Sequence, residues 1–103
     1  MASIKRLTVD ELHALGDVQI VDVREQDEWD AGHIPGSVFA PYHSIRGIPE
    51  GVDPSEPVAV ICASGQRAVV GASLIQRFGV HGVIHIVDGG VPAWGRAGYP
   101  IQR

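Results

Sequence analysis

Cys62 is the only cysteine among the 103 residues, and its surroundings are those of a reactive thiol. It ends an apolar run, Val58-Ala59-Val60-Ile61-Cys62, and Ala63-Ser64-Gly65-Gln66-Arg67 then leads into a predicted helix. The small residues let the backbone turn tightly, so that successive amide hydrogens can bind an anion at the amino terminus of that helix. This field, with the Arg67 guanidinium nearby, is expected to favour the Cys62 thiolate and make it a nucleophile. The alternative is an inert cysteine buried at the end of a strand.

The elements that must position this loop alternate between strands and helices. Short runs rich in β-branched residues predict strands over residues 4–7, 19–23, 37–40, 58–62 and 83–87. Helix signals, including the capping-box pattern from Thr8 to Glu11, cover residues 8–16, 27–31 and 68–78, and 41–57 is predicted as loop with one helical turn. This order predicts an α/β fold: an open parallel sheet with helices on both faces and any ligand at the carboxyl ends of the strands.

Length and composition exclude several classes of protein. A chain of 103 residues and 11.0 kDa predicts one domain, residues 1–103. Hydrophobic residues make up 45%, mean hydropathy is +0.10, and no apolar run is long enough to cross a membrane. The net charge of -4, with scattered basic residues, argues against nucleic acid as a partner. A lone cysteine and no visible export signal lead us to expect a cytoplasmic protein.

The histidines do not predict a metal site. His81 and His85 have a spacing that would suit a metal on a helix, but on the predicted strand they lie about 13 Å apart. We therefore expect them at the surface or at a strand end. His33 lies in a turn of Gly and Pro residues, where bonding to the backbone is favoured over a role as general base. No metal and no organic cofactor is expected.

Other polar and aromatic residues are assigned supporting roles. Asp22 and Arg24 lie at the carboxyl end of a predicted strand, at the edge where ligands bind, and we expect them to orient loops through hydrogen bonds. Trp29 and Trp94 are predicted to anchor the core. The pair Gly89-Gly90 lacks the Lys of a phosphate-binding loop and is predicted to be a turn.

Several segments in order resemble one family. Cys62-Ala63-Ser64-Gly65-Gln66-Arg67-Ala68 resembles the active-site loop of single-domain rhodanese-like sulfurtransferases. Two further sets of segments are similar to that family's signatures. The first set is Val21-Asp22-Val23-Arg24-Glu25 with Glu28-Trp29 and Gly32-His33-Ile34-Pro35-Gly36-Ser37. The second, carboxyl-terminal set is Asp88-Gly89-Gly90 with Trp94 and Gly98-Tyr99-Pro100. The resemblance implies a five-stranded parallel sheet, and sulfane sulfur transfer from thiosulfate or another persulfide donor to cyanide or a thiol, through a Cys62 persulfide.

The resemblance also implies residue roles and alternatives. Cys62 would be the nucleophile, the amides of Ala63, Ser64, Gly65, Gln66 and Arg67 the persulfide-binding groups, and Arg67 a charge partner. Related arsenate reductases and phosphatases have one more residue in this loop; the four residues between Cys62 and Arg67 match the sulfurtransferase length. The loop has no basic residue before Arg67, which implies weak thiosulfate binding. A sulfur-relay or regulatory module that docks a sulfur-accepting protein stays open as an alternative.

Overall fold

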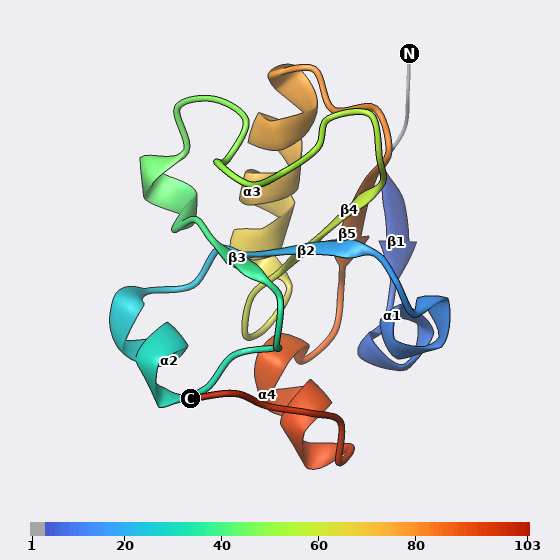
Figure 1. The fold of residues 1–103 in the computed structure, drawn as a ribbon, viewed down its shortest axis with the longest axis vertical. Coiled ribbons are helices and arrows are strands. Elements are labelled where there is room, and N and C mark those ends of the chain that lie inside the picture. Colours follow the sequence, from blue (N-terminus) through green and yellow to red (C-terminus); the bar gives the residue numbers. More distant parts are fainter. Residues whose placement is uncertain (1–3) are drawn as a thin grey trace.

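The computed structural model describes residues 4–103, so the first three residues of the predicted domain lie outside it. Its five strands form one sheet in which every pair is parallel, as predicted (Figure 1). Across the sheet the order is β1 (Lys5–Leu7), β5 (Val83–Ile86), β4 (Val58–Ile61), β2 (Gln19–Asp22) and β3 (Val38–Phe39). β4 is therefore the central strand, and the cysteine loop, residues 62–67, begins where it ends.

Residues 4–103 also form four helices and one short 3-10 turn. They are α1 (Val9–Leu15), α2 (Gln26–Ala31), α3 (Gln66–Arg77), α4 (Gly90–Arg96) and the 3-10 turn η1 (Tyr42–Ser44). The predicted capping box of α1 is confirmed: the Glu11 amide donates to the Thr8 hydroxyl at 3.3 Å, and the Thr8 amide donates to the Glu11 carboxylate at 2.9 Å. The interpretation of Gly89-Gly90 as only a turn is wrong, because Gly89 caps α4 and Gly90 begins it.

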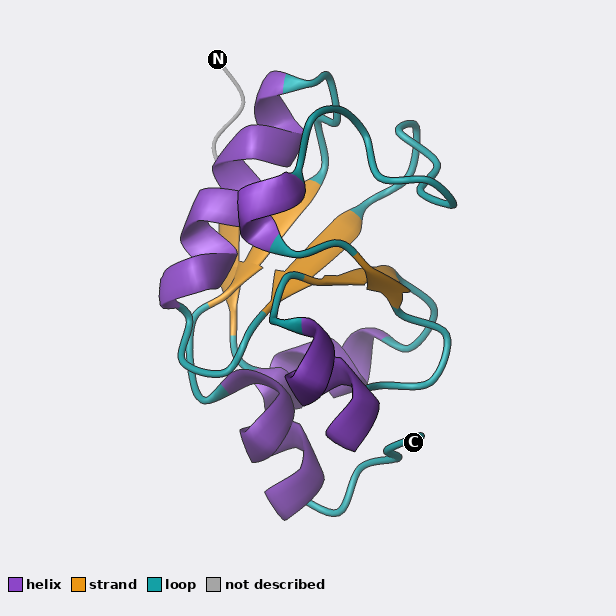
Figure 2. Cartoon of the chain, turned by 90° about the vertical axis from the view of Figure 1, so that its left-hand side faces the viewer, coloured by secondary structure: helices purple, strands orange, loops and turns teal. Residues whose placement is uncertain are grey.

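The sheet separates two apolar layers. α3 covers one face, while α1 and α4 cover the other, with α2 beside α4 (Figures 1 and 2). The layer under α3 contains Val21, Val23, Ile45, Val52, Val58, Val60, Cys62, Ala68, Ala72, Ile75, Val80 and Val83. The opposite layer contains Leu7, Val9, Leu12, Ile20, Ile34, Ala59, Ile61, Ile84, Ile86, Val91 and Trp94.

The two tryptophans differ in burial. Trp94 is a core residue, as predicted, and its indole N–H donates to the Pro100 carbonyl at 2.7 Å. Trp29 belongs to neither layer: it is half-buried and its ring stacks on that of His33 at 3.6 Å. Its assignment as a core anchor is wrong, because α2 contributes no buried residue. Among residues 4–103, no helix has the length and apolarity needed to cross a membrane.

Candidate active site

The Cys62 side chain lies fully buried where β4 meets α3. Two backbone amides donate to its Sγ, that of Gly65 at 3.1 Å and that of Ala68 at 3.3 Å. Both lie at the amino terminus of α3, where the free N–H groups of a helix carry partial positive charge. Gly65 was among the residues predicted to surround the sulfur. Ala68 was not. It directly follows the loop, and its place at the start of the predicted helix is the signal that could have identified its amide as a donor.

The loop can turn this tightly because residue 65 is glycine. Gly65 has φ of +87°, and a Cβ there would lie 2.6 Å from the backbone oxygen of Val87, which follows β5. A side chain at this position is excluded both by the backbone conformation and by the packing. The close approach places the beginning of α3 directly against the chain that leaves β5.

α4 holds the cysteine backbone from the other face of the sheet. The Val91 amide donates to the Cys62 carbonyl at 2.9 Å. A Cβ on Gly90 would lie 1.7 Å from that same oxygen, and Gly90 has φ of +60°. The Gly89-Gly90 pair therefore allows a helix to approach the end of β4, which is the role that the prediction of a turn missed.

Arg67 forms an ion pair across the site with Glu28 of α2. Its Nη1 and Nη2 donate to the two carboxylate oxygens at 2.6 and 2.9 Å. The hydrogen bonds from Arg67 are the main reason that the pKa of Glu28 is lowered from 4.5 to about 2, and the same bonds raise the pKa of Arg67. Arg67, predicted as the charge partner of Cys62, thus interacts most strongly with the Glu28 carboxylate and more weakly with Cys62.

Asp22 and Arg24 form a buried pair at the end of β2. Arg24 Nε and Nη2 donate to the Asp22 carboxylate at 2.9 and 2.8 Å. Arg24 Nη2 also donates at 2.7 Å to the carbonyl of Gly32, the residue that ends α2. The pair therefore joins the end of β2 to the end of the helix that carries Glu28, and no hydrogen bond connects it to Cys62 in the described part of the chain.

His33, His81 and His85 lie in three different settings. His33 Nδ1 is 2.9 Å from the Trp29 carbonyl, which agrees with the backbone bond expected for it. His81 is exposed in the turn before β5. The expectation of a surface or strand-end position is wrong for His85, which is half-buried within β5 with its Nε2 2.7 Å from the Gly65 carbonyl. No pattern in the sequence pairs His85 with a residue 20 positions earlier.

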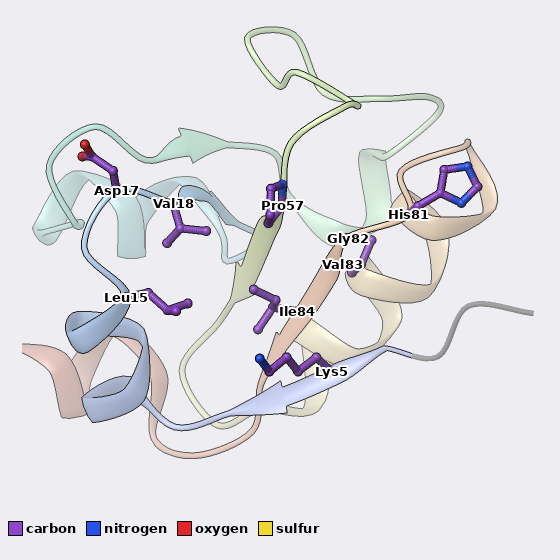
Figure 3. A pocket seen from close by; sticks show the side chains of 9 residues that line it. All are labelled: Lys5, Leu15, Asp17, Val18, Pro57, His81, Gly82, Val83 and Ile84. Atoms are coloured by element: carbon purple, nitrogen blue, oxygen red, sulfur yellow. The ribbon is translucent and has the colours of Figure 1, made fainter.

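Of the surface hollows in the described part of the chain, two lie at opposite ends of the strands. One, of about 340 Å³, is lined by Pro57, Val83 and Ile84 at the starts of β4 and β5, and by Leu15 at the end of α1 (Figure 3). No residue of the cysteine loop lines it. The other, of about 370 Å³, lies between α2 and α4 and is bordered by Arg24 and Glu28. The second hollow is the one on the side of the molecule where Arg67 meets Glu28.

The chain is similar to known proteins in both sequence and structure. A family model described as rhodanese-like domain matches residues 8–97. Thiosulfate sulfurtransferase GlpE of Pseudomonas savastanoi pv. phaseolicola is 33% identical over 102 residues, covering 97% of this chain and 94% of that protein. The putative sulfur carrier protein YrkF of Bacillus subtilis is 32% identical over 72 residues, covering 70% of this chain and 39% of that protein. A rhodanese-like domain protein of Staphylococcus aureus superposes with a TM-score of 0.80 at 31% identity, covering 97% and 100% of the two chains.

Proposed function

Because this chain belongs to the rhodanese-like domain family, we propose that it is a sulfurtransferase that carries sulfane sulfur as a persulfide on Cys62. The observation that carries the proposal is the pair of amides, from Gly65 and Ala68, aimed at the Cys62 Sγ. Hydrogen bonds of this kind stabilise a sulfur that bears negative charge. An inert buried cysteine needs no such donors, since a thiol is only a weak acceptor.

The proposed reaction has two steps. The Cys62 thiolate attacks the outer sulfur of thiosulfate, the S–S bond of the donor breaks, and sulfite leaves with the bonding electron pair. An acceptor such as cyanide then attacks the outer sulfur of the persulfide, forming thiocyanate and returning the Cys62 thiolate. Sulfite leaves and the persulfide stands on Cys62 before the acceptor reacts, so the scheme is ping-pong. Neither leaving group needs a proton, so no acid–base triad is required.

The loop supplies further donors for the transferred sulfur. The amides of Ala63, Ser64, Gln66 and Arg67 make no hydrogen bond to Sγ in the part of the chain that the structure describes. The outer sulfur of a persulfide lies about 2 Å beyond Sγ. We assign these four amides to that outer sulfur, while Gly65 and Ala68 hold the inner one.

The charges beside the loop favour a persulfide over thiosulfate as the donor. Arg67 is the only Lys or Arg in the cysteine loop, and its guanidinium forms two hydrogen bonds with Glu28. A dianionic donor therefore meets a cation whose charge is already compensated. A persulfide on a small molecule or on a protein carries less negative charge at its reacting end than thiosulfate does. The corresponding acceptor is a thiol on a small molecule or on a protein.

Mass spectrometry tests the proposal. The protein is incubated with thiosulfate or with glutathione persulfide, the donor is removed, and the intact mass is measured. We expect a gain of one sulfur atom on Cys62, faster with the persulfide, and none in Cys62→Ser. Addition of cyanide should return the original mass and release thiocyanate. A Cys62→Ser variant that forms thiocyanate as fast as the parent would contradict the covalent scheme, and a parent that hydrolyses aryl phosphate through Cys62 would support the phosphatase alternative instead.

A further inference from the structure

We infer that His85 is a positioning residue for sulfur transfer, because its Nε2–H fixes the peptide that follows Gly65 and so aims the Gln66 amide. The inference rests on the proposed function. Its physical basis is the 2.7 Å contact between His85 Nε2 and the Gly65 carbonyl oxygen. A carbonyl only accepts hydrogen bonds, so this ring nitrogen must carry the proton.

His85 is placed for this contact by the sheet. In β5 it is paired with Val60 of β4 on one side and with Arg6 of β1 on the other. Side chains alternate along a strand, and Val83, two residues earlier, packs in the layer under α3. The His85 ring therefore projects toward the face that α3 covers, where the helix begins at Gln66.

The contact controls one amide because the peptide group is planar. Gly65 O and Gln66 N–H belong to the same peptide, and the described chain has no cis peptide bond. In a trans peptide these two groups point in opposite directions. A carbonyl held toward β5 thus turns the Gln66 N–H away from β5 and into the loop, where we have assigned it to the outer sulfur.

Gly65 needs such an external restraint. A glycine at positive φ has no side chain to limit its rotation, and neighbouring conformations cost it little. One side of Gly65 is closed by the Val87 backbone. Within residues 4–103, its carbonyl otherwise accepts the longer helical bond from the Val69 amide, at 3.3 Å. His85 provides the shorter bond, at 2.7 Å, and so joins β5 to the loop.

Three variants separate a positioning role from a general effect on folding. His85→Phe keeps a planar ring and removes the donor, whereas His85→Gln keeps an N–H donor at nearly the same reach. His81→Phe removes the exposed histidine before the same strand and serves as the matched control. We expect His85→Phe to slow sulfur loading from glutathione persulfide about tenfold, the effect of one charge-assisted hydrogen bond, and His85→Gln to recover most of that rate. His81→Phe should load like the parent.

Nuclear magnetic resonance gives a readout that needs no activity. We expect the parent His85 ring to be protonated at Nε2, and the Gly65 and Gln66 amide resonances to shift in His85→Phe while those in His81→Phe stay in place. An unprotonated Nε2, or unchanged amide resonances and loading in a folded His85→Phe, would overturn the inference. Equal loss of loading in His85→Phe and His85→Gln would also do so. A parent that takes up no sulfur refutes the proposed function instead, and the resonances then decide the inference alone.

Discussion

Glu28→Gln removes the carboxylate that pairs with Arg67 and keeps the shape of the side chain. Lowering the pKa of Glu28 from 4.5 to about 2 corresponds to about 3 kcal/mol of folding free energy. The Arg67 and Glu28 side chains are 26% and 29% exposed, so solvent screens part of this interaction. We therefore expect the free energy of unfolding of Glu28→Gln at pH 7 to be about 1–2 kcal/mol lower than that of the parent, which lowers Tm by about 5–10 °C in a domain of this size.

The pH dependence gives the sharper test. The folded-state pKa of Glu28 lies below its unfolded-state value, so its stabilising effect is complete above about pH 5 and is lost as the pH falls from 4.5 toward 2. The other carboxyl groups titrate in both proteins, so the difference between parent and variant isolates Glu28. Urea unfolding should show that the difference in free energy of unfolding between parent and Glu28→Gln is smaller at pH 3 than at pH 7 by roughly half or more.

Glu50→Gln is the matched control, because Glu50 is an exposed glutamate outside the ion pair. It should unfold like the parent at both pH values. Free energies of unfolding for Glu28→Gln and parent that differ by the same amount at pH 7 and pH 3 would refute the reasoning from the ion pair. The same variant also frees Arg67, so we expect it to load sulfur from thiosulfate about threefold faster or more.

Two further changes probe the backbone around the sulfur. Gly90→Ala should lower the free energy of unfolding by about 3 kcal/mol or more, because its Cβ would lie 1.7 Å from the Cys62 carbonyl oxygen at a φ of +60°. Gly98→Ala, with a φ of +86° and open space around it, should lower that free energy by only about 1 kcal/mol. Thermal unfolding of the two variants compares these losses. One glycine inserted between Ser64 and Gly65 should lower the rate of thiocyanate formation about tenfold or more, by moving at least one amide out of reach of the sulfur, and a rate equal to the parent's would contradict the assigned fit of the loop.

Local sequence patterns predicted most of the fold. The strand expected over residues 58–62 is β4, and the helix expected over 68–78 is α3, which begins two residues earlier at Gln66. Both elements are predicted by a run of residues with a constant hydrophobic pattern that ends at Gly or at small residues. Such signals involve residues only a few positions apart in the sequence. α4 escaped prediction because two glycines and a proline near its start are poor helix formers. Its position depends on packing against β4, which no local pattern reports.

The candidate site could be predicted from the sequence only where its residues are neighbours in the chain. The loop from Cys62 to Arg67 is continuous in sequence, and its length and small residues indicated an anion-binding turn. The pairing of Arg67 with Glu28 joins positions 39 apart, and that of His85 with Gly65 joins positions 20 apart. Such contacts depend on which strand ends meet at the sheet edge. They become visible only when the strand order, with β4 between β5 and β2, is known.

α2 stands apart from the other helices in how it is held. It has no buried residue, and its Trp29 ring lies 5.2 Å from that of Phe39 in β3. Three polar contacts also attach it: Glu28 to Arg67, the Gly32 carbonyl to Arg24, and the Ala31 carbonyl to Arg103 at 3.1 Å. Segments with few buried apolar contacts open locally at low free energy, while the rest of the domain stays folded. The Cys62 side chain, by contrast, is fully buried. We therefore expect a large donor or acceptor of the proposed reaction to displace this helix, which holds the partner of Arg67, at less cost to the core than any other part of the candidate site.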